Sequence, residues 1–319
     1  MVLPISLDNV EGAARRLVPH LHRTPLASSR TLSERLGTRV SLKLEIFQKT
    51  GSFKPRGAFN QLLNLDPGRW ERGVVGVSGG NYAQGLAYAG RTLGVPVRIL
   101  VPEGTPAHYV AATRGYGAEV EVVPTIAEAF ARADEYATGG RAALHPFDDP
   151  RMMAGDGTLA LEVVEDAPDL TDVFVSIGGG GLMTGVATAV KGLVPGARVW
   201  GVETLGCHAM RLALDAGHPV EMQPSSIAKT LAAPWVSEGT LAAAREYLED
   251  VVVVPDDATV AALLLLLERA KVLTEPAAAC TLAAAEVVRE RLGSHAVLIL
   301  CGGNATLEDL AGWRRRFGV

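Results

Sequence analysis

Short runs of β-branched and aliphatic residues alternate with amphipathic stretches of helical period along most of this chain. The runs predict strands over residues 40–44, 73–77, 97–101, 119–123, 172–177, 198–202, 251–254 and 296–300. Helical periodicity is clearest over residues 83–93, 127–136 and 183–193. Strands that alternate with helices favour parallel sheets covered by helices, so the pattern predicts an α/β fold. Several runs are apolar throughout, as in strands buried on both faces.

The length of 319 residues, without a repeat or flexible linker, suits two lobes better than one small core. The units between about residues 73 and 144 have a tight, even spacing. They predict a small domain over residues 67–147. Residues 1–66 and 148–319 would then join into a larger one.

The amino-acid composition limits which partners this protein can bind and in which cellular compartment it is expected. A hydrophobic content of 48% with 20% charged residues is that of a folded globular protein. A net charge of −5 offers no basic surface for nucleic acid or acidic lipid, and no apolar run is long enough to span a membrane. The first residues lack a secretory signal, and Cys207, Cys280 and Cys301 follow no disulfide or metal pattern. We therefore expect a cytoplasmic protein.

Lys54 is the first candidate for chemistry. The chain has six lysines against twenty-four arginines, so arginine is its ordinary surface cation. Lys54 stands between Phe53 and Pro55, and proline is typical of a first helical turn. The positive end of a helix would lower the pKa of the amine, as a Schiff-base nucleophile requires. The alternative is a solvated lysine in a first helical turn.

A run of four glycines is the second candidate, and it lies between a predicted strand and a predicted helix. Their backbone N–H groups and the helix dipole favour binding of a phosphate. The alternative is a tight turn. The spacing departs from Gly-x-Gly-x-x-Gly, because Met183 and Thr184 stand where the third glycine is needed. Glu203 ends the next strand, where a ribose-binding acid would lie, so a dinucleotide site stays open.

Residues 78–85 also lead from a strand into a helix. Small residues with a hydroxyl and an amide at a helix N-terminus favour a carboxylate pocket. An ordinary helix cap by Ser78 or Asn81 is the alternative.

Cys301 follows the last predicted strand, within Cys301-Gly302-Gly303-Asn304. Its thiol could be a nucleophile, a metal ligand or a neutral hydrogen-bonding group. No histidine lies nearby in sequence, and a buried free cysteine is often only a small hydrophobe.

Taken together, these motifs resemble fold-type II pyridoxal-phosphate enzymes, and within them the threonine/serine dehydratase and serine racemase family. The resemblance rests on residues 52–58, 78–81, 178–181 and 301–304, and it includes residues 22–26, 145–150 and the pair Glu275-Pro276. It implies a two-lobed fold like that of the tryptophan synthase β-subunit. It also implies pyridoxal 5′-phosphate as cofactor and a homodimer.

The resemblance assigns a role to each motif. Lys54 would hold the cofactor as a Schiff base and later remove the substrate Cα proton, while Phe53 would lie beside the cofactor ring. Asn81 would contact the phenolic oxygen, and Cys301 would leave the pyridine nitrogen unprotonated. The 5′-phosphate would bind Gly178, Gly179, Gly180, Gly181 and Leu182. The substrate carboxylate would bind Ser78, with Gly79, Gly80, Asn81 and Tyr82 around it.

Four departures from the family pattern bear on the reaction. Tyr82 replaces the usual histidine, and Lys229 lies where an aspartate is usual. Ala209 stands where the family's cation site has an acid, so we expect no metal even though Glu203 matches. Gly79 lacks the side chain that racemases use on the second face of Cα.

We therefore expect a dehydratase that converts an L-β-hydroxy amino acid to a 2-oxo acid and ammonia. Threonine, serine and bulkier analogues such as phenylserine remain open as substrates. An amino-acid racemase or a β-replacement enzyme of the same fold is the alternative. From another class, a non-catalytic nucleotide- or dinucleotide-binding protein also remains open.

Overall fold

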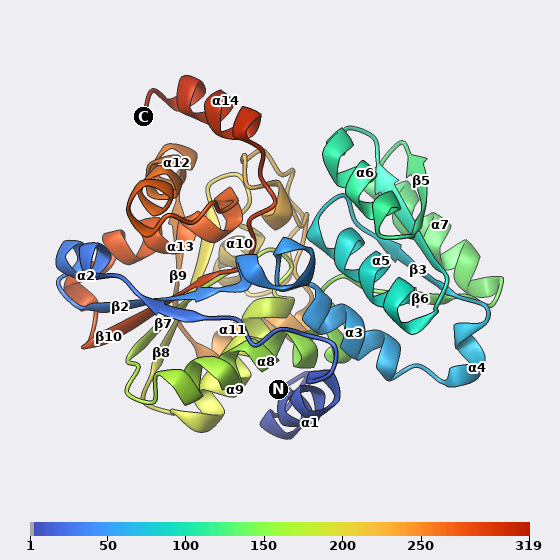
Figure 1. Ribbon diagram of the computed structural model, residues 1–319, viewed down its shortest axis with the longest axis horizontal. Helices are drawn as coiled ribbons and strands as arrows, with labels where there is room; N and C mark the ends of the chain where they lie inside the picture. The colour runs from blue at the N-terminus through green and yellow to red at the C-terminus, as the bar shows by residue number, and fades with distance from the viewer. Residues whose placement is uncertain (1–2) are drawn as a thin grey trace.

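The computed structural model describes residues 3–319; Met1 and Val2, part of the stretch inspected for a signal, lie outside the described residues. Its strands form two separate sheets, seen side by side in Figure 1. The larger sheet has the order β1-β2-β10-β7-β8-β9 and is parallel except for β1. Its strands are β1 (Leu26–Ser28), β2 (Arg39–Leu44), β7 (Asp172–Ser176), β8 (Arg198–Thr204), β9 (Leu248–Val254) and β10 (His295–Leu300).

The smaller sheet is wholly parallel, in the order β5-β4-β3-β6. Its strands are β3 (Val74–Val77), β4 (Val97–Pro102), β5 (Glu119–Val123) and β6 (Ala142–Leu144). All four lie within residues 67–147, whereas the strands of the larger sheet lie outside that range.

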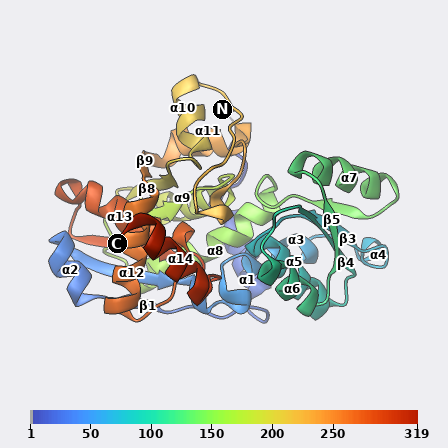
Figure 2. The same ribbon diagram turned by 90° about the horizontal axis from the view of Figure 1, so that it is seen from above.

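Helices cover both faces of the larger sheet, with α13 on one face and α9 on the other. Around the smaller sheet, α5 and α7 pack against β3 and β4. Figure 2 shows the two groups of elements from above, joined through α3 and α8. The helices are α1 (Leu7–Leu17), α2 (Arg30–Leu36), α3 (Pro55–Leu63), α4 (Pro67–Trp70), α5 (Asn81–Leu93), α6 (Ala107–Gly115), α7 (Ile126–Thr138), α8 (Pro150–Asp166), α9 (Gly181–Leu193), α10 (Ala209–Ala216), α11 (Glu238–Tyr247), α12 (Asp256–Leu265), α13 (Pro276–Val287) and α14 (Leu307–Phe317). Short turns of 3-10 helix or π-helix occur at Glu45–Phe47, Lys49–Gly51, Lys229–Leu231, Leu266–Ala270 and Arg289–Arg291.

The predicted α/β class with parallel-rich sheets is confirmed, and each predicted strand is present within a few residues of its expected limits. Strands β1 and β6 were not predicted. Each has only three residues, which is too short for a periodic signal.

The topology brings the predicted motifs to strand ends, where open α/β sheets place their ligands. Ser78 follows β3, residues 178–181 follow β7, and Cys301 follows β10. No helix among residues 3–319 combines the length and apolar character needed to cross a bilayer.

Candidate active site

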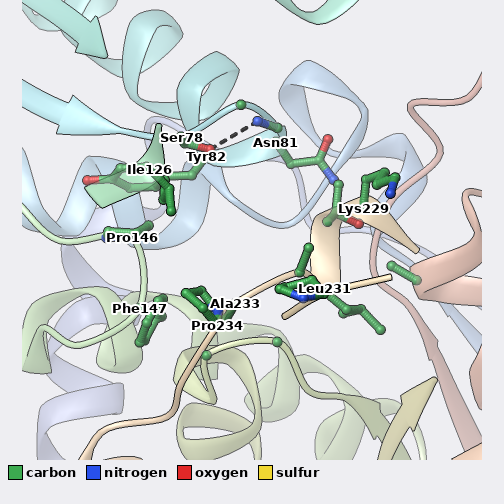
Figure 3. A pocket seen from close by; sticks show the side chains of 18 of the residues that line it. Ser78, Asn81, Tyr82, Ile126, Pro146, Phe147, Lys229, Leu231, Ala233 and Pro234 are labelled. Carbon is green, nitrogen blue, oxygen red and sulfur yellow. Dashed lines mark hydrogen bonds between the residues drawn. The ribbon is translucent and has the colours of Figure 1, made fainter. Parts of the chain in front are cut away.

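A cavity of about 590 Å³ lies between the two sheets, and Figure 3 shows it from close by. The segment that holds the smaller sheet, residues 67–147, contributes residues 77–82, 102–106 and 126–127 with Phe130, Pro146 and Phe147. The rest of the chain contributes Phe53, Lys54, Ser176, residues 178–182, 221–224 and 229–235, Glu275, Ala277 and Cys301. Every residue predicted to hold cofactor or substrate lines this one cavity.

Lys54 stands directly before α3, with Pro55 as the first helical residue, as predicted. Its Nζ donates to the carbonyl of Pro146 at 2.8 Å. The same atom lies 4.9 Å from the centre of the Phe53 ring and 5.6 Å from that of Tyr82. Aromatic rings and one carbonyl thus surround the amine.

Burial lowers the pKa of the Lys54 amine below its ordinary value, against the opposing effects of Asp156 and Cys301. The expected direction is therefore confirmed. Its main cause is desolvation, because a charged ammonium loses its hydration in the cavity wall.

The glycine loop connects β7 to α9 and is enclosed on both sides. A Cβ on Gly179 would lie 2.2 Å from the Phe147 ring, and one on Gly178 would lie 3.3 Å from Leu231 Cα. Gly180 has φ +95°, a left-handed conformation that favours glycine. A side chain at Gly179 or Gly180 therefore does not fit, and the loop presents its backbone to the cavity at the start of a helix.

Cys301 is buried, and its Sγ lies 3.7 Å from the carbonyl of Ala277. Burial, with a smaller contribution from Glu275, raises the pKa of the thiol well above its ordinary value. The thiol is therefore neutral. The backbone N–H of Phe53 donates to the carbonyl of Cys301 at 3.0 Å, which joins the Lys54 segment to the end of β10.

The segment after β3 is held by hydrogen bonds at both ends. Ser78 Oγ accepts from the N–H of Gly80 at 3.1 Å. Asn81 Nδ2 donates to both carboxylate oxygens of Glu275, at 2.9 and 3.0 Å, and its Oδ1 accepts from Asn304 at 2.8 Å. Glu275 thus orients the Asn81 amide.

Tyr82 contributes the face of its ring to the cavity. Its hydroxyl is buried and donates to Gln61 Oε1 at 2.8 Å. Burial raises the pKa of this hydroxyl well above its ordinary value, so it keeps its proton at neutral pH and does not act as a catalytic acid.

Two further residues considered from the sequence have different positions. Lys229 is exposed and lines the cavity. Glu203 does not line it, and its carboxylate accepts from the N–H groups of Met210 and Arg211, both at 2.9 Å. Glu203 thus caps α10, and a ribose-binding role has no support. No group of three His, Cys, Asp or Glu side chains suited to a metal ion occurs among residues 3–319.

Four residues were not identified from the sequence. Phe130 and Trp235 both line the cavity, and their rings contact each other with centres 5.8 Å apart. Thr105 lies beside Gly79. Asp156 is fully buried in α8. For Asp156 there was a signal, since an acid flanked by glycines in a buried helix is unusual.

The model of the family described as "Pyridoxal-phosphate dependent enzyme" matches residues 17–302. The chain belongs to this family. It is 38% identical to an L-threonine ammonia-lyase of Thermotoga maritima, over 94% of this chain and 76% of that one. It is 39% identical to a phenylserine dehydratase of Ralstonia pickettii, over 98% and 96%. A solved structure of maize serine racemase superposes with a TM-score of 0.92 at 31% identity, over 98% and 97%.

These comparisons confirm the predicted fold type, the pyridoxal-phosphate cofactor and the lyase class. The residues that line the cavity fit that cofactor. They include the Lys54 amine, the glycine loop at the start of α9 and the neutral thiol of Cys301. The chemistry of such a donor set suits an aldehyde, a phosphate and an unprotonated ring nitrogen.

Proposed function

We propose that this protein is an ammonia-lyase that removes water and then ammonia from an L-β-hydroxy amino acid with a bulky apolar side chain. Phenylserine is the substrate we expect to be preferred over threonine and serine. The observation that carries this choice is the pair of contacting aromatic rings, Phe130 and Trp235, in the lining of the cavity. Sequence identity does not separate the two substrates, because the chain is 39% identical to a phenylserine dehydratase and 38% identical to an L-threonine ammonia-lyase.

The residues that would hold the cofactor are those of the cavity wall. Lys54 would bind it as a Schiff base beside Phe53, and the backbone of residues 178–182 would bind its phosphate. Asn81 and Cys301 would contact the ring. When bound, the cofactor supplies an electron sink for the charge that develops at Cα.

The chain's own groups would carry the proton and the substrate. Ser78 and the N–H groups of Gly79, Gly80 and Tyr82 would hold the carboxylate at the start of α5, where the helix dipole favours an anion. The desolvated Lys54 amine would take the Cα proton, since its lowered pKa leaves the neutral form available.

The aromatic residues that line the cavity, Phe130 and Trp235, would select the side chain of the substrate. Phe130 comes from α7, which packs on the smaller sheet, and Trp235 comes from the segment before α11, so the two rings come from distant parts of the chain. Phe130 also stacks on His145, with ring centres 5.4 Å apart. An aryl group against such rings gains about 0.5–1.5 kcal/mol per pair beyond its burial.

A panel of β-hydroxy amino acids tests the proposal through release of 2-oxo acid and ammonia. We expect kcat/KM for L-threo-phenylserine to exceed that for threonine roughly tenfold or more, since a few buried carbon atoms are worth that ratio. The panel includes 3-hydroxyaspartate, because Lys229 could pair with an acidic side chain. Preference for threonine or 3-hydroxyaspartate would contradict the assignment of a bulky apolar substrate.

Variants of the wall provide the matched control. Trp235→Leu should lower kcat/KM for phenylserine roughly three- to tenfold, from the lost aromatic pair, and leave threonine nearly unchanged. Trp313 lies outside the cavity lining, so Trp313→Leu should leave kcat/KM unchanged for both phenylserine and threonine.

The anchor itself is tested by Lys54→Ala, which should remove the visible absorbance of the bound cofactor and the elimination while the protein stays folded. Lys229→Ala, at the other lysine of the cavity, should retain both. Retention of the absorbance and turnover in Lys54→Ala would show that another lysine is the anchor.

The alternatives have less support. A racemase needs a second acid or base opposite Lys54, and Gly79 supplies none. β-Replacement would need an added nucleophile, so release of pyruvate or another 2-oxo acid without one argues against it. A nucleotide binder would not show the cofactor absorbance.

We also propose a large cofactor domain of residues 1–66 and 148–319 and a small domain of residues 67–147 that closes on the substrate. The three buried, unbridged cysteines support a reducing, cytoplasmic location. A homodimer is proposed from the family resemblance, and light scattering of the purified protein tests it.

A further inference from the structure

Thr230 lies in the short 3-10 turn Lys229–Leu231, which lines the cavity. The turn is close to two parts of the candidate active site. A Cβ on Gly178 would lie 3.3 Å from Leu231 Cα, and a Cβ on Gly80 would lie 3.3 Å from the methyl carbon of Thr230. The turn therefore packs against both the glycine loop and the residue directly before α5.

The hydroxyl of Thr230 donates to Oε1 of Glu275 at 2.7 Å. Glu275 is buried and lines the same cavity. Its carboxylate also accepts from Asn81 Nδ2, at 2.9 and 3.0 Å, and from the N–H of Asn304 at 3.3 Å. The bond from Thr230 is the shortest of the four. All of these donors are neutral, so the buried carboxylate depends on each of their hydrogen bonds.

Glu275 in turn determines which atoms Asn81 presents to the cavity. Asn81 Oδ1 accepts from Asn304 Nδ2 at 2.8 Å, and Asn81 Nδ2 donates to Glu275. The two N–H bonds of an amide diverge too widely to reach both oxygens of one carboxylate, so a single N–H serves Oε1 and Oε2. That leaves the second N–H for a ligand in the cavity, which Asn81 lines. Because the terminal torsion of a glutamate is soft, this orientation depends on what holds the carboxylate in place.

We propose that Thr230 is a positioning residue for the cofactor. Its hydroxyl holds the Glu275 carboxylate, and the carboxylate holds the Asn81 amide with one N–H available to the phenolic oxygen of pyridoxal 5′-phosphate. Because the Thr230 side chain is branched at Cβ, the same hydrogen bond keeps its methyl group against Gly80 in the predicted carboxylate pocket. The inference rests on the proposed contact of Asn81 with the cofactor.

A purely local role for Thr230 predicts a different outcome. If the hydroxyl only anchored the turn Lys229–Leu231, its removal would affect cofactor binding independently of Asn81. Thr230→Val removes the hydroxyl and keeps the branched shape, whereas Thr230→Ser keeps the hydroxyl. Thr113→Val is the matched control, because Thr113 is buried, lies outside the cavity lining and donates its hydroxyl to the carbonyl of Tyr109 at 2.8 Å.

The test is the dissociation constant of pyridoxal 5′-phosphate, measured by equilibrium dialysis of the loaded protein. Thr230→Val should raise the constant roughly three- to tenfold, the range expected for the loss of one hydrogen bond. Thr230→Ser should stay close to the wild-type value, and Thr113→Val should not change it. In the Asn81→Ala background, Thr230→Val should have little further effect, since residues that act through one another are not additive. If Thr230→Val cannot be purified folded, Thr230→Ala replaces it in the same cycle.

The other outcomes separate this inference from the proposed function. A constant that rises in Asn81→Ala but not in Thr230→Val overturns the inference and leaves the proposed function intact. An equal rise from Thr230→Val in both backgrounds also overturns it, because the hydroxyl would then act independently of Asn81. An unchanged constant in Asn81→Ala contradicts the contact of Asn81 with the cofactor, and the inference with it. Wild-type protein that binds no pyridoxal 5′-phosphate overturns the proposed function itself.

Discussion

Arg56→Lys should destabilise the protein strongly although it keeps the positive charge. Arg56 is buried at the start of α3 and donates five hydrogen bonds. Nε and Nη2 each bind the Glu45 carboxylate at 2.8 Å, and Nη1 and Nη2 bind Glu162 at 2.8 and 3.1 Å. The fifth bond, from Nη1, reaches Thr158 at 3.1 Å. This geometry needs the planar fork of a guanidinium.

The size of the expected destabilisation follows from the number of N–H donors that lysine and arginine have. A lysine ammonium has three N–H donors, so at least two of the five hydrogen bonds are lost. Hydrogen bonds to charged groups contribute about 1.5–3 kcal/mol each, and the lower value gives a loss of about 3 kcal/mol. Because folded domains are stable by only about 5–15 kcal/mol, this is a large fraction of the total.

Urea unfolding followed by tryptophan fluorescence measures the loss, since Trp200 is fully buried. Arg30→Lys is the control, because Arg30 and its partner Glu34 are both exposed. That variant should change the free energy of unfolding by less than about 0.5 kcal/mol. A loss below about 1 kcal/mol in Arg56→Lys would refute the reasoning, and would show that the carboxylates find other partners.

Three further outcomes are expected. Cys301→Ser should retain most elimination, measured as 2-oxo acid release, because the buried thiol is neutral and a hydroxyl is neutral too, whereas Cys301→Asp should protonate the cofactor ring and lower elimination. Burial raises the pKa of Glu203 from 4.5 to about 8, so the folded state binds this proton more tightly than the unfolded state does. The free energy of unfolding should therefore fall as pH rises from about 5 to about 8. The urea midpoint should fall less over this range in Glu203→Gln than in the wild type. A Cβ on Gly79 would lie 2.6 Å from Thr105 Oγ1. Chiral analysis of residual serine should therefore show a higher racemisation-to-elimination ratio in Gly79→Ser/Thr105→Ala than in Gly79→Ser, and equal ratios would contradict the importance of this contact.

The sequence alone determined the features that depend on local pattern. Strand and helix periodicity predicted the α/β class, and glycines at residues 178–181 marked a strand-to-helix loop. The rarity of lysine and the following Pro55 singled out Lys54. These signals are local because backbone preference and amphipathicity act over a few residues.

Tertiary structure decided what depends on residues distant in the chain. Glu203 matched a ribose-binding position by sequence, yet it caps α10, because β8 and α10 bring its carboxylate to two backbone N–H groups. The aromatic wall exists only because α7 and the segment before α11 meet at the cavity. Asp156 reaches the start of α3 because glycines let α8 approach it closely. Burial, which sets the pKa of Lys54 and Cys301, is likewise a property of the packed chain and of no short segment.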